Sequence, residues 1–260
     1  MKIIHFNLFL AFALLSLPGF SFGQNDQKND QTTIELNKEK FSEPFSWMVW
    51  KDQVKPNNQK AYEEKISALI EKAKTQPNFM RILTFFESTT STYYFFYPFS
   101  ESQDWHAIYS FWSKESQQLD TKKFLVNYSI FLTKSIPELS QFPQTGQVSL
   151  ANPNYVHMEY FEISPNAEEQ FVKLLQEWKI DSHNKAPECG WFVQKMVVGE
   201  NLPTYVLLWG DCLKNVENIQ QLDRFLLDKK AYGTIVKKVI SEDKVYIPKL
   251  STAKLDLSGK

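Results

Sequence analysis

Residues 54–57 read Val-Lys-Pro-Asn and are followed by Tyr62, and residues 163–166 read Ile-Ser-Pro-Asn and are followed by Phe171. The spacing between the two stretches is 109 residues at both the proline and the aromatic position. Proline suits the first position of a helix, because its missing N–H would have no partner there. Each stretch therefore marks the change from a strand to a helix, and its recurrence indicates that the chain repeats one unit.

Two further matches occur in the same order along the chain. Residues 92–97 (Thr-Tyr-Tyr-Phe-Phe-Tyr) match 204–209 (Thr-Tyr-Val-Leu-Leu-Trp), and residues 136–140 (Ile-Pro-Glu-Leu-Ser) match 247–251 (Ile-Pro-Lys-Leu-Ser). Their offsets of 112 and 111 differ little from the first one. Ordered matches with small insertions predict an internal duplication.

Each copy shows the same series of patterns. A short strand leads into an amphipathic helix, two strands joined by a turn follow, and two more segments with helical spacing of apolar residues complete the copy. The expected strands are 46–51, 81–87 and 92–99 in the first copy and 155–161, 191–198 and 204–211 in the second. The last helical segment carries Phe124, Leu125 and Tyr128, matched by Ile235, Val236 and Val239.

This order of elements is the ferredoxin-like arrangement, an antiparallel sheet with helices on one face. One such unit leaves the other face of its sheet bare, and two units packed sheet to sheet cover both faces. The fused pair resembles the dimeric α+β barrel superfamily over most of residues 44–250, on element order alone. The resemblance implies an α+β fold in which two tandem ferredoxin-like units form an intramolecular barrel of antiparallel sheets.

The start of the chain has the pattern of a targeting signal. Lys2 precedes the apolar run 8–17, and residues 21–23 (Ser-Phe-Gly) form a small-x-small cleavage pattern. We therefore expect a secreted or periplasmic protein. The predicted organisation is a signal peptide at 1–23, a disordered leader at 24–43, repeats at 44–140 and 155–251 separated by a linker at 141–154, and a tail at 252–260.

Composition excludes several classes of function. The net charge is −1, and only Arg81 and Arg224 are arginines among 29 basic residues, so nucleic-acid binding is not expected. No apolar stretch reaches the roughly 20 residues of a membrane span. No Gly-rich phosphate loop, nucleophile elbow, Cys-x-x-Cys or recognised metal-ligand spacing occurs. We expect no cofactor and no metal site, and a monomer or a homodimer.

Alternation along the strands separates two faces. We expect Trp47, Val49, Val156 and Met158 to lie under the helices. The opposite face is expected to line the barrel, with His157 and Glu159 as its polar groups. The ligand-binding candidates on that face are Trp50, Tyr93, Tyr97, His157, Glu159, Tyr205 and Trp209.

These candidates support more than one function. Aromatic stripes on sheet faces are commonly packing, and the main hypothesis is a non-catalytic protein that is structural or binds a small apolar or aromatic ligand. The alternative, implied by the superfamily, is a cofactor-independent monooxygenase or a haem-dependent enzyme, with His157 as acid or base and Glu159 orienting it or the substrate. An envelope interaction module is a third hypothesis without a specific motif.

The two cysteines, Cys189 and Cys212, lie near the two ends of the hairpin expected in the second repeat. In an oxidising compartment they are candidates for a disulfide that joins the base of this hairpin. Two buried thiols are the alternative.

Overall fold

The structure is a computed structural model that describes residues 33–35, 46–75, 82–99, 102–118, 120–141, 155–185, 190–210, 213–252 and 254–256. The first repeat consists of β2 (Ser46–Val54), η1 (Pro56–Asn58), α2 (Gln59–Lys74), β3 (Leu83–Glu87), β4 (Thr92–Phe99), α3 (Ser102–Gln118), η2 (Thr121–Phe124) and β5 (Leu125–Ser135). The second consists of β6 (Tyr155–Ile163), η3 (Pro165–Ala167), α4 (Glu168–Lys185), β7 (Trp191–Val198), β8 (Thr204–Gly210), α5 (Leu213–Asp228), β9 (Val236–Tyr246) and η4 (Pro248–Leu250).

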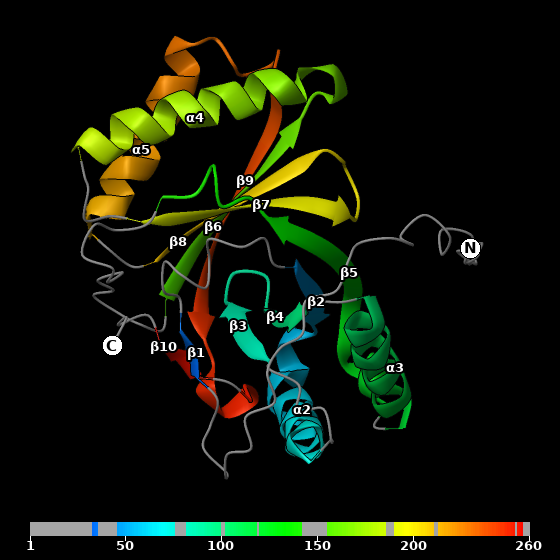
Figure 1. Ribbon diagram of the computed structural model, residues 1–260. Coiled ribbons are helices and arrows are strands. Elements are labelled where there is room, and N and C mark those ends of the chain that lie inside the picture. The colour runs from blue at the N-terminus through cyan, green and yellow to red at the C-terminus, as the bar shows by residue number, and fades with distance from the viewer. Residues whose placement is uncertain are drawn as a thin grey trace.

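The strands form one closed antiparallel barrel in the order β2-β4-β3-β9-β6-β8-β7-β5. Each repeat supplies four neighbouring strands in the ferredoxin-like order. The repeats join where β3 pairs with β9 and where β5 pairs with β7. Figure 1 shows the two halves, with α4 and α5 beside the strands of the second repeat and α2 and α3 beside those of the first.

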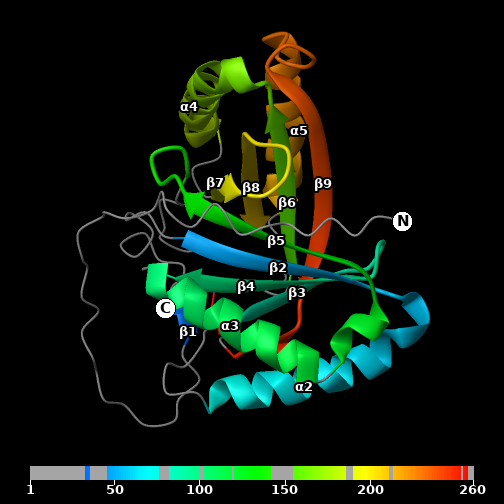
Figure 2. The same ribbon diagram turned by 90° about the vertical axis from the view of Figure 1, so that its right-hand side faces the viewer.

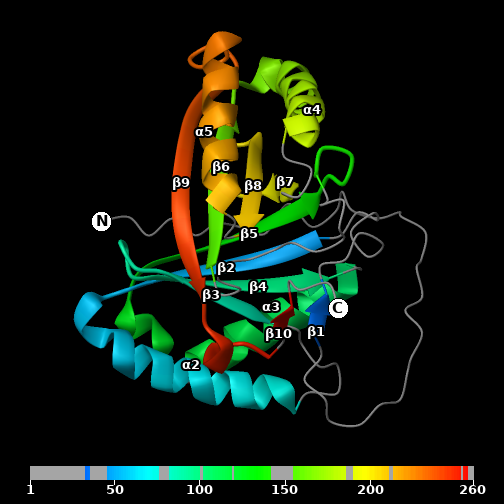
Figure 3. The same cartoon turned by 90° about the vertical axis from the view of Figure 1, so that its left-hand side faces the viewer.

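The helices cover the outer side of the barrel. Figures 2 and 3 show α2 and α3 on the far side of the first sheet from the second repeat. The amphipathic helix expected after Pro56 is α2, and its buried residues are Tyr62, Ile66, Leu69, Ile70 and Ala73. The strand-to-helix junctions are also confirmed, because short 3-10 turns that start at Pro56 and Pro165 lead into α2 and α4.

Equivalent backbone contacts recur in the two repeats. The Lys55 N–H donates to the Phe124 carbonyl at 2.9 Å, and the Ser164 N–H donates to the Ile235 carbonyl at 2.8 Å. The pairing of β2 with β5 shifts register next to Val54, and that of β6 with β9 shifts at the matching Ile163. The duplication is therefore present in the details of the backbone as well as in the order of elements.

The last segment of each repeat differs from the expectation. Residues 125–135 and 236–246 are strands, not helices, and they complete the four-stranded sheets. Their first halves pair with one neighbouring strand only, β2 or β6, and are largely exposed, so the alternation of apolar and polar side chains that marks a half-buried strand is missing there. The spacing of Phe124, Leu125 and Tyr128 imitated a helix for this reason.

The predicted assignment of strand faces was wrong, and the correct one is its inverse. The interior is filled by side chains from both repeats, and it contains the four residues expected under the helices, Trp47, Val49, Val156 and Met158. The aromatic candidates instead pack toward the helices: Trp50, Tyr93 and Tyr97 in the first repeat, Tyr205 and Trp209 in the second. Both faces of these strands are rich in apolar residues, so alternation separates them without showing which one closes on the other repeat.

Residues outside the repeats add one small feature. Within the expected leader, β1 (Thr33–Glu35) pairs in parallel with β10 (Lys254–Asp256), which lies within the expected tail. The predicted signal peptide, Cys189 and Cys212 lie outside the described residues. Among the helices that the structure describes, none is long and apolar enough to cross a membrane.

Candidate functional site

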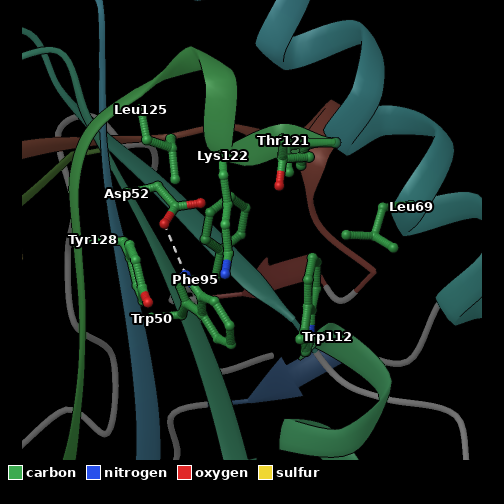
Figure 4. A pocket seen from close by; sticks show the side chains of 10 residues that line it. Trp50, Asp52, Leu69, Phe95, Trp112, Thr121, Lys122, Leu125 and Tyr128 are labelled. Atoms are coloured by element: carbon green, nitrogen blue, oxygen red, sulfur yellow. Dashed lines mark hydrogen bonds between the residues drawn. The ribbon is translucent and has the colours of Figure 1, made fainter. Parts of the chain in front are cut away.

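A small pocket lies between the sheet of the first repeat and its helices (Figure 4). Its wall is formed by strands β2, β4 and β5, helices α2 and α3, and the short turn η2. The lining residues are Trp50, Asp52, Ile66, Leu69, Phe95, Trp112, Thr121, Lys122, Leu125 and Tyr128. The free space has room for about one water molecule, so a larger ligand requires side chains to move.

Asp52 is the buried acidic group of this pocket. It follows Trp50 on the helix-facing side of β2 and is only 5% exposed. The Tyr62 hydroxyl donates to Oδ2 at 2.7 Å, and the Trp50 indole N–H donates to Oδ1 at 2.7 Å. Burial raises the pKa of Asp52 to about 6, and the hydrogen bonds from Tyr62 and Trp50 oppose this shift. The carboxyl can therefore hold or release a proton close to neutral pH.

Aromatic rings surround the approach to Asp52. Trp50 stacks on Tyr128 with ring centroids 6.4 Å apart and an angle of 21° between the planes. The Trp112 ring lies 6.4 Å from Trp50 and 5.7 Å from Phe95. Tyr109, 40% exposed on α3, lies 6.5 Å from Trp50. A planar apolar molecule would find large contact surfaces here.

Two hydrogen-bond donors in this pocket have no partner among the residues that the structure describes. The Trp112 indole nitrogen is buried, and it lacks an acceptor. Lys122 is exposed, and no described carboxylate forms an ion pair with it. Figure 4 shows Lys122 reaching from η2 into the pocket between Trp50 and Trp112. Both donors are thus free for an acceptor oxygen of a ligand.

His157 and Glu159 lie next to each other on β6, as the sequence predicted, but their side chains are not in the barrel interior and do not line this pocket. The ring Nδ1 of His157 is 2.6 Å from Oδ1 of Asp243, and Nε2 is 3.7 Å from Oε1 of Glu159. Ser241 donates to Glu159 at 3.3 Å. Burial lowers the pKa of His157, but the contacts with Glu159 and Asp243 outweigh it and leave that pKa raised.

The remaining predicted candidates are packing residues of two separate layers. Tyr93 donates to Glu63 at 2.6 Å, and Tyr205 donates to Glu168 at 2.8 Å, so their rings lie in the core and their hydroxyls at its rim. Tyr97 packs on Trp112 at 5.5 Å, and Trp209 lies 6.0 Å from His157. The seven candidates therefore do not form one site, and only Trp50 lines the pocket.

The barrel interior also contains charged groups that the sequence analysis did not identify. Lys244 on β9 is fully buried, 2.5 Å from Glu242, and Lys51 lies 3.5 Å from the same carboxylate. Tyr94 donates to Glu242 at 2.8 Å. Burial lowers the pKa of Lys244 to about 8 against the opposing charge of Glu242. This cluster joins strands of both repeats, and its members satisfy one another.

Sequence reasoning missed Asp52, Trp112, Lys122 and Tyr128. One signal was present: Asp52 interrupts the apolar face that Met48 and Trp50 begin on β2, and a carboxylate on such a face requires hydrogen-bond donors. Lys122 and Tyr128 could not be found in this way, because their segment was expected to be helical. Trp112 comes from α3, whose position over β4 only the tertiary structure gives.

Comparison with known proteins identifies the fold. No protein-family model and no curated protein matches the sequence. Among solved structures, an anthrone oxidase-like protein superposes with a TM-score of 0.53 at 10% identity, over 78% of this chain and 91% of that one. The fold is the dimeric α+β barrel. Two more α+β barrels superpose over most of their length.

One of these barrels is a presumed monooxygenase from Lactobacillus acidophilus, with a TM-score of 0.51 and 10% identity over 78% of this chain and 93% of that one. The other is a chlorite dismutase variant from Candidatus Nitrospira defluvii, with a TM-score of 0.53 and 9% identity over 79% of this chain and 94% of that one. At identities this low the similarity shows a shared fold only. The activity of this chain has to be inferred from its own residues.

A haem does not fit the described residues. In the second repeat, the layer between sheet and helices is filled by Trp178, Trp191 and Trp209, each at most 2% exposed. His157 has its ring between two carboxylates, and His106 and His183 are exposed on helices. Within the same ranges no group of three or more His, Cys, Asp or Glu side chains is arranged to hold a metal ion.

Proposed function

We propose that the chain is a cofactor-independent, monooxygenase-type enzyme, and that Asp52 is its general base. The observation that carries the proposal is a buried carboxyl with a pKa of about 6 inside an aromatic pocket. A base is most effective when its pKa lies near the working pH, and burial is the usual way in which proteins raise a carboxyl pKa toward neutrality. The names of two of the fold neighbours, monooxygenase and anthrone oxidase-like, agree with this chemistry.

Each residue of the pocket has a separate role in the proposed reaction. Asp52 takes a proton from a weakly acidic C–H or O–H group, and the rings of Trp50, Trp112 and Tyr128 hold the planar substrate. Tyr62 and Trp50 donate to the carboxylate and keep its oxygens in place. The resulting delocalised anion reacts with dioxygen. For anthrone, the balanced reaction takes up one O2, places one oxygen atom in the new carbonyl group and releases the other as water.

The proposal is tested by proton exchange, which does not depend on oxygen. We expect wild-type protein under nitrogen to catalyse exchange of the methylene hydrogens of anthrone with D2O, followed by NMR. Asp52→Asn should slow this exchange by about a hundredfold or more, because a positioned base contributes about that much. Wild-type activity should rise with pH through about 6, where Asp52 loses its proton.

His157→Asn is the control for the alternative site, since His157 lies in the other repeat. We expect this variant to exchange the anthrone hydrogens at the wild-type rate. The proposal is overturned if Asp52→Asn keeps full exchange activity, or if His157→Asn is the variant that loses it.

We propose in addition that the chain is exported to the periplasm or secreted, and that Cys189 and Cys212 form a disulfide there. The support is the signal-like pattern at residues 1–23 and the expected hairpin between the cysteines. N-terminal sequencing of the protein from its cells should begin at Gln24. Mass spectrometry before and after reduction should show one bond, and free thiols in the exported protein would refute it.

A further inference from the structure

The Asp52 pocket has an imbalance of donors over acceptors. Asp52 is its carboxylate, and both oxygens already accept hydrogen bonds from Tyr62 and Trp50. The buried Trp112 N–H and the Lys122 ammonium add two donors that have no acceptor in the described structure. A buried donor without a partner is unfavourable, and such groups are commonly satisfied by water or ligand.

Lys122 differs from the lysines around it. Its neighbour Lys123 pairs with Asp120 at 3.2 Å, and Lys72 pairs with Glu115 at 2.7 Å. The Lys122 ammonium instead lies 5.8 Å from the centre of the Tyr128 ring, over a wall of the pocket. Its side chain is long, exposed and without a fixed polar partner, so it can move aside when a ligand enters. This movement would enlarge a space that now admits about one water.

We propose that Lys122 is the oxyanion-binding residue of the Asp52 pocket and that the pocket selects planar ligands with an anionic oxygen. Trp112 is the second donor to that oxygen. The inference rests on the proposed function, because proton transfer to Asp52 creates such an anion on the substrate. The favoured complex therefore has a neutral Asp52 and a negatively charged ligand, which the positive charge of the Lys122 ammonium stabilises more strongly than it stabilises a neutral ligand.

The second repeat lacks both charged groups of the Asp52 pocket. At the offset of 111 the position that matches Lys122 is Gly233, whose φ of +80° favours glycine, and at the offset of 109 the position that matches Asp52 is Phe161. The acid and the cation are thus both present in one repeat and both missing in the other.

The test uses three one-ring probes of similar shape: benzoate (anionic), benzamide (neutral) and benzylammonium (cationic). Binding to the full-length protein is followed by tryptophan fluorescence at about pH 5, where Asp52 is mostly protonated. We expect benzoate to bind about tenfold more tightly than benzamide, the size of effect of one charge-assisted hydrogen bond. Lys122→Met should remove this preference, and the matched control Lys123→Met should keep it.

The outcomes separate this inference from the proposed function. Equal binding of benzoate and benzamide, stronger binding of benzylammonium, no binding of any probe, or an unchanged preference in Lys122→Met would each overturn it. Asp52→Asn should keep the benzoate preference, and extend it to pH 8, because Asn stays neutral. If Asp52→Asn also exchanges anthrone hydrogens normally, the general-base proposal fails while the assignment of Lys122 as the anion-binding residue remains.

Discussion

The two repeats have the same order of elements but different residues between the sheet and its helices. In the first, Asp52 on β2 lies opposite Tyr128 on β5 and accepts a hydrogen bond from Tyr62. In the second, Phe161 on β6 lies opposite Val239 on β9, and its ring is 5.6 Å from that of Phe171. Phe161 and Phe171 are the counterparts of Asp52 and Tyr62 at the offset of 109. One layer holds a carboxyl with its donors, and the other is an apolar core.

This difference shows which parts the fold requires and which it does not. The second repeat is built without a carboxyl at this position, so the layer between sheet and helices needs only close packing there. A buried carboxyl without compensation would cost several kcal/mol. Its presence in the first repeat, with donors from Tyr62 and Trp50, is therefore better explained by function than by folding.

The largest effect is expected from making the second repeat resemble the first. Phe161→Asp would bury a carboxyl with no donor from Phe171, and we expect the free energy of unfolding to fall by about 4 kcal/mol or more. The double variant Phe161→Asp/Phe171→Tyr supplies the missing hydroxyl and should recover about 1 kcal/mol. Urea unfolding of the three proteins measures both values. No recovery in the double variant would show that the Tyr62 contact does not stabilise Asp52 in this way.

A smaller effect is expected from the proton equilibrium of Asp52. Its pKa of about 6 in the folded state lies above the ordinary 3.8, so the folded protein binds more protons than the unfolded chain between these values. Stability therefore falls as the pH rises through this window, by up to about 3 kcal/mol for this group. Asp52→Asn lacks this loss, and its stability relative to wild type should increase from pH 4 to pH 7.5. If the stability difference between Asp52→Asn and wild type does not change with pH, the pKa of Asp52 is not raised in the folded protein.

The smallest effect is expected at His157, which contacts the carboxylates of Glu159 and Asp243. The matching position in the first repeat is Met48, which carries no charge. Its pKa is raised in the folded state, so the ion pairs with Glu159 and Asp243 stabilise the fold below about pH 6.5 and weaken as the pH rises through the folded-state pKa. His157→Gln should destabilise the protein by up to about 1 kcal/mol at pH 5.5 and by less at pH 9. Thermal unfolding at the two pH values measures this, and an equal loss at both would contradict it.

Much of the local structure could be predicted from the sequence. The two helix starts at Pro56 and Pro165 and the hairpin strands 92–99 and 191–198 lie where the patterns placed them. The amphipathic helix expected after Pro56 is also present, as α2. These features depend on neighbours in the chain, through proline geometry and through the spacing of apolar residues along one element. The ferredoxin-like order followed from them.

The candidate site was predicted poorly. Trp50 is the one sequence candidate that lines the pocket, and the pair His157 and Glu159 is close in space but lies in the other repeat. Asp52 shares a strand face with Trp50, yet its proposed role depends on the hydroxyl of Tyr62, a residue that the spacing of α2 places in the apolar core. A pattern of hydrophobicity does not distinguish a tyrosine that packs from one that also donates a hydrogen bond.

The sequence by itself determined the repeat, the helix starts at Pro56 and Pro165 and the residues that share a strand face, because these follow from covalent spacing and backbone geometry. Only the tertiary structure decided which face forms the barrel interior, that 125–135 and 236–246 are strands, and that Asp52, Trp112 and Lys122 meet in one pocket. The physical reason is that burial and the pKa of Asp52 are sums over atoms from distant segments, and these sums exist only after the strands have paired and the helices have packed.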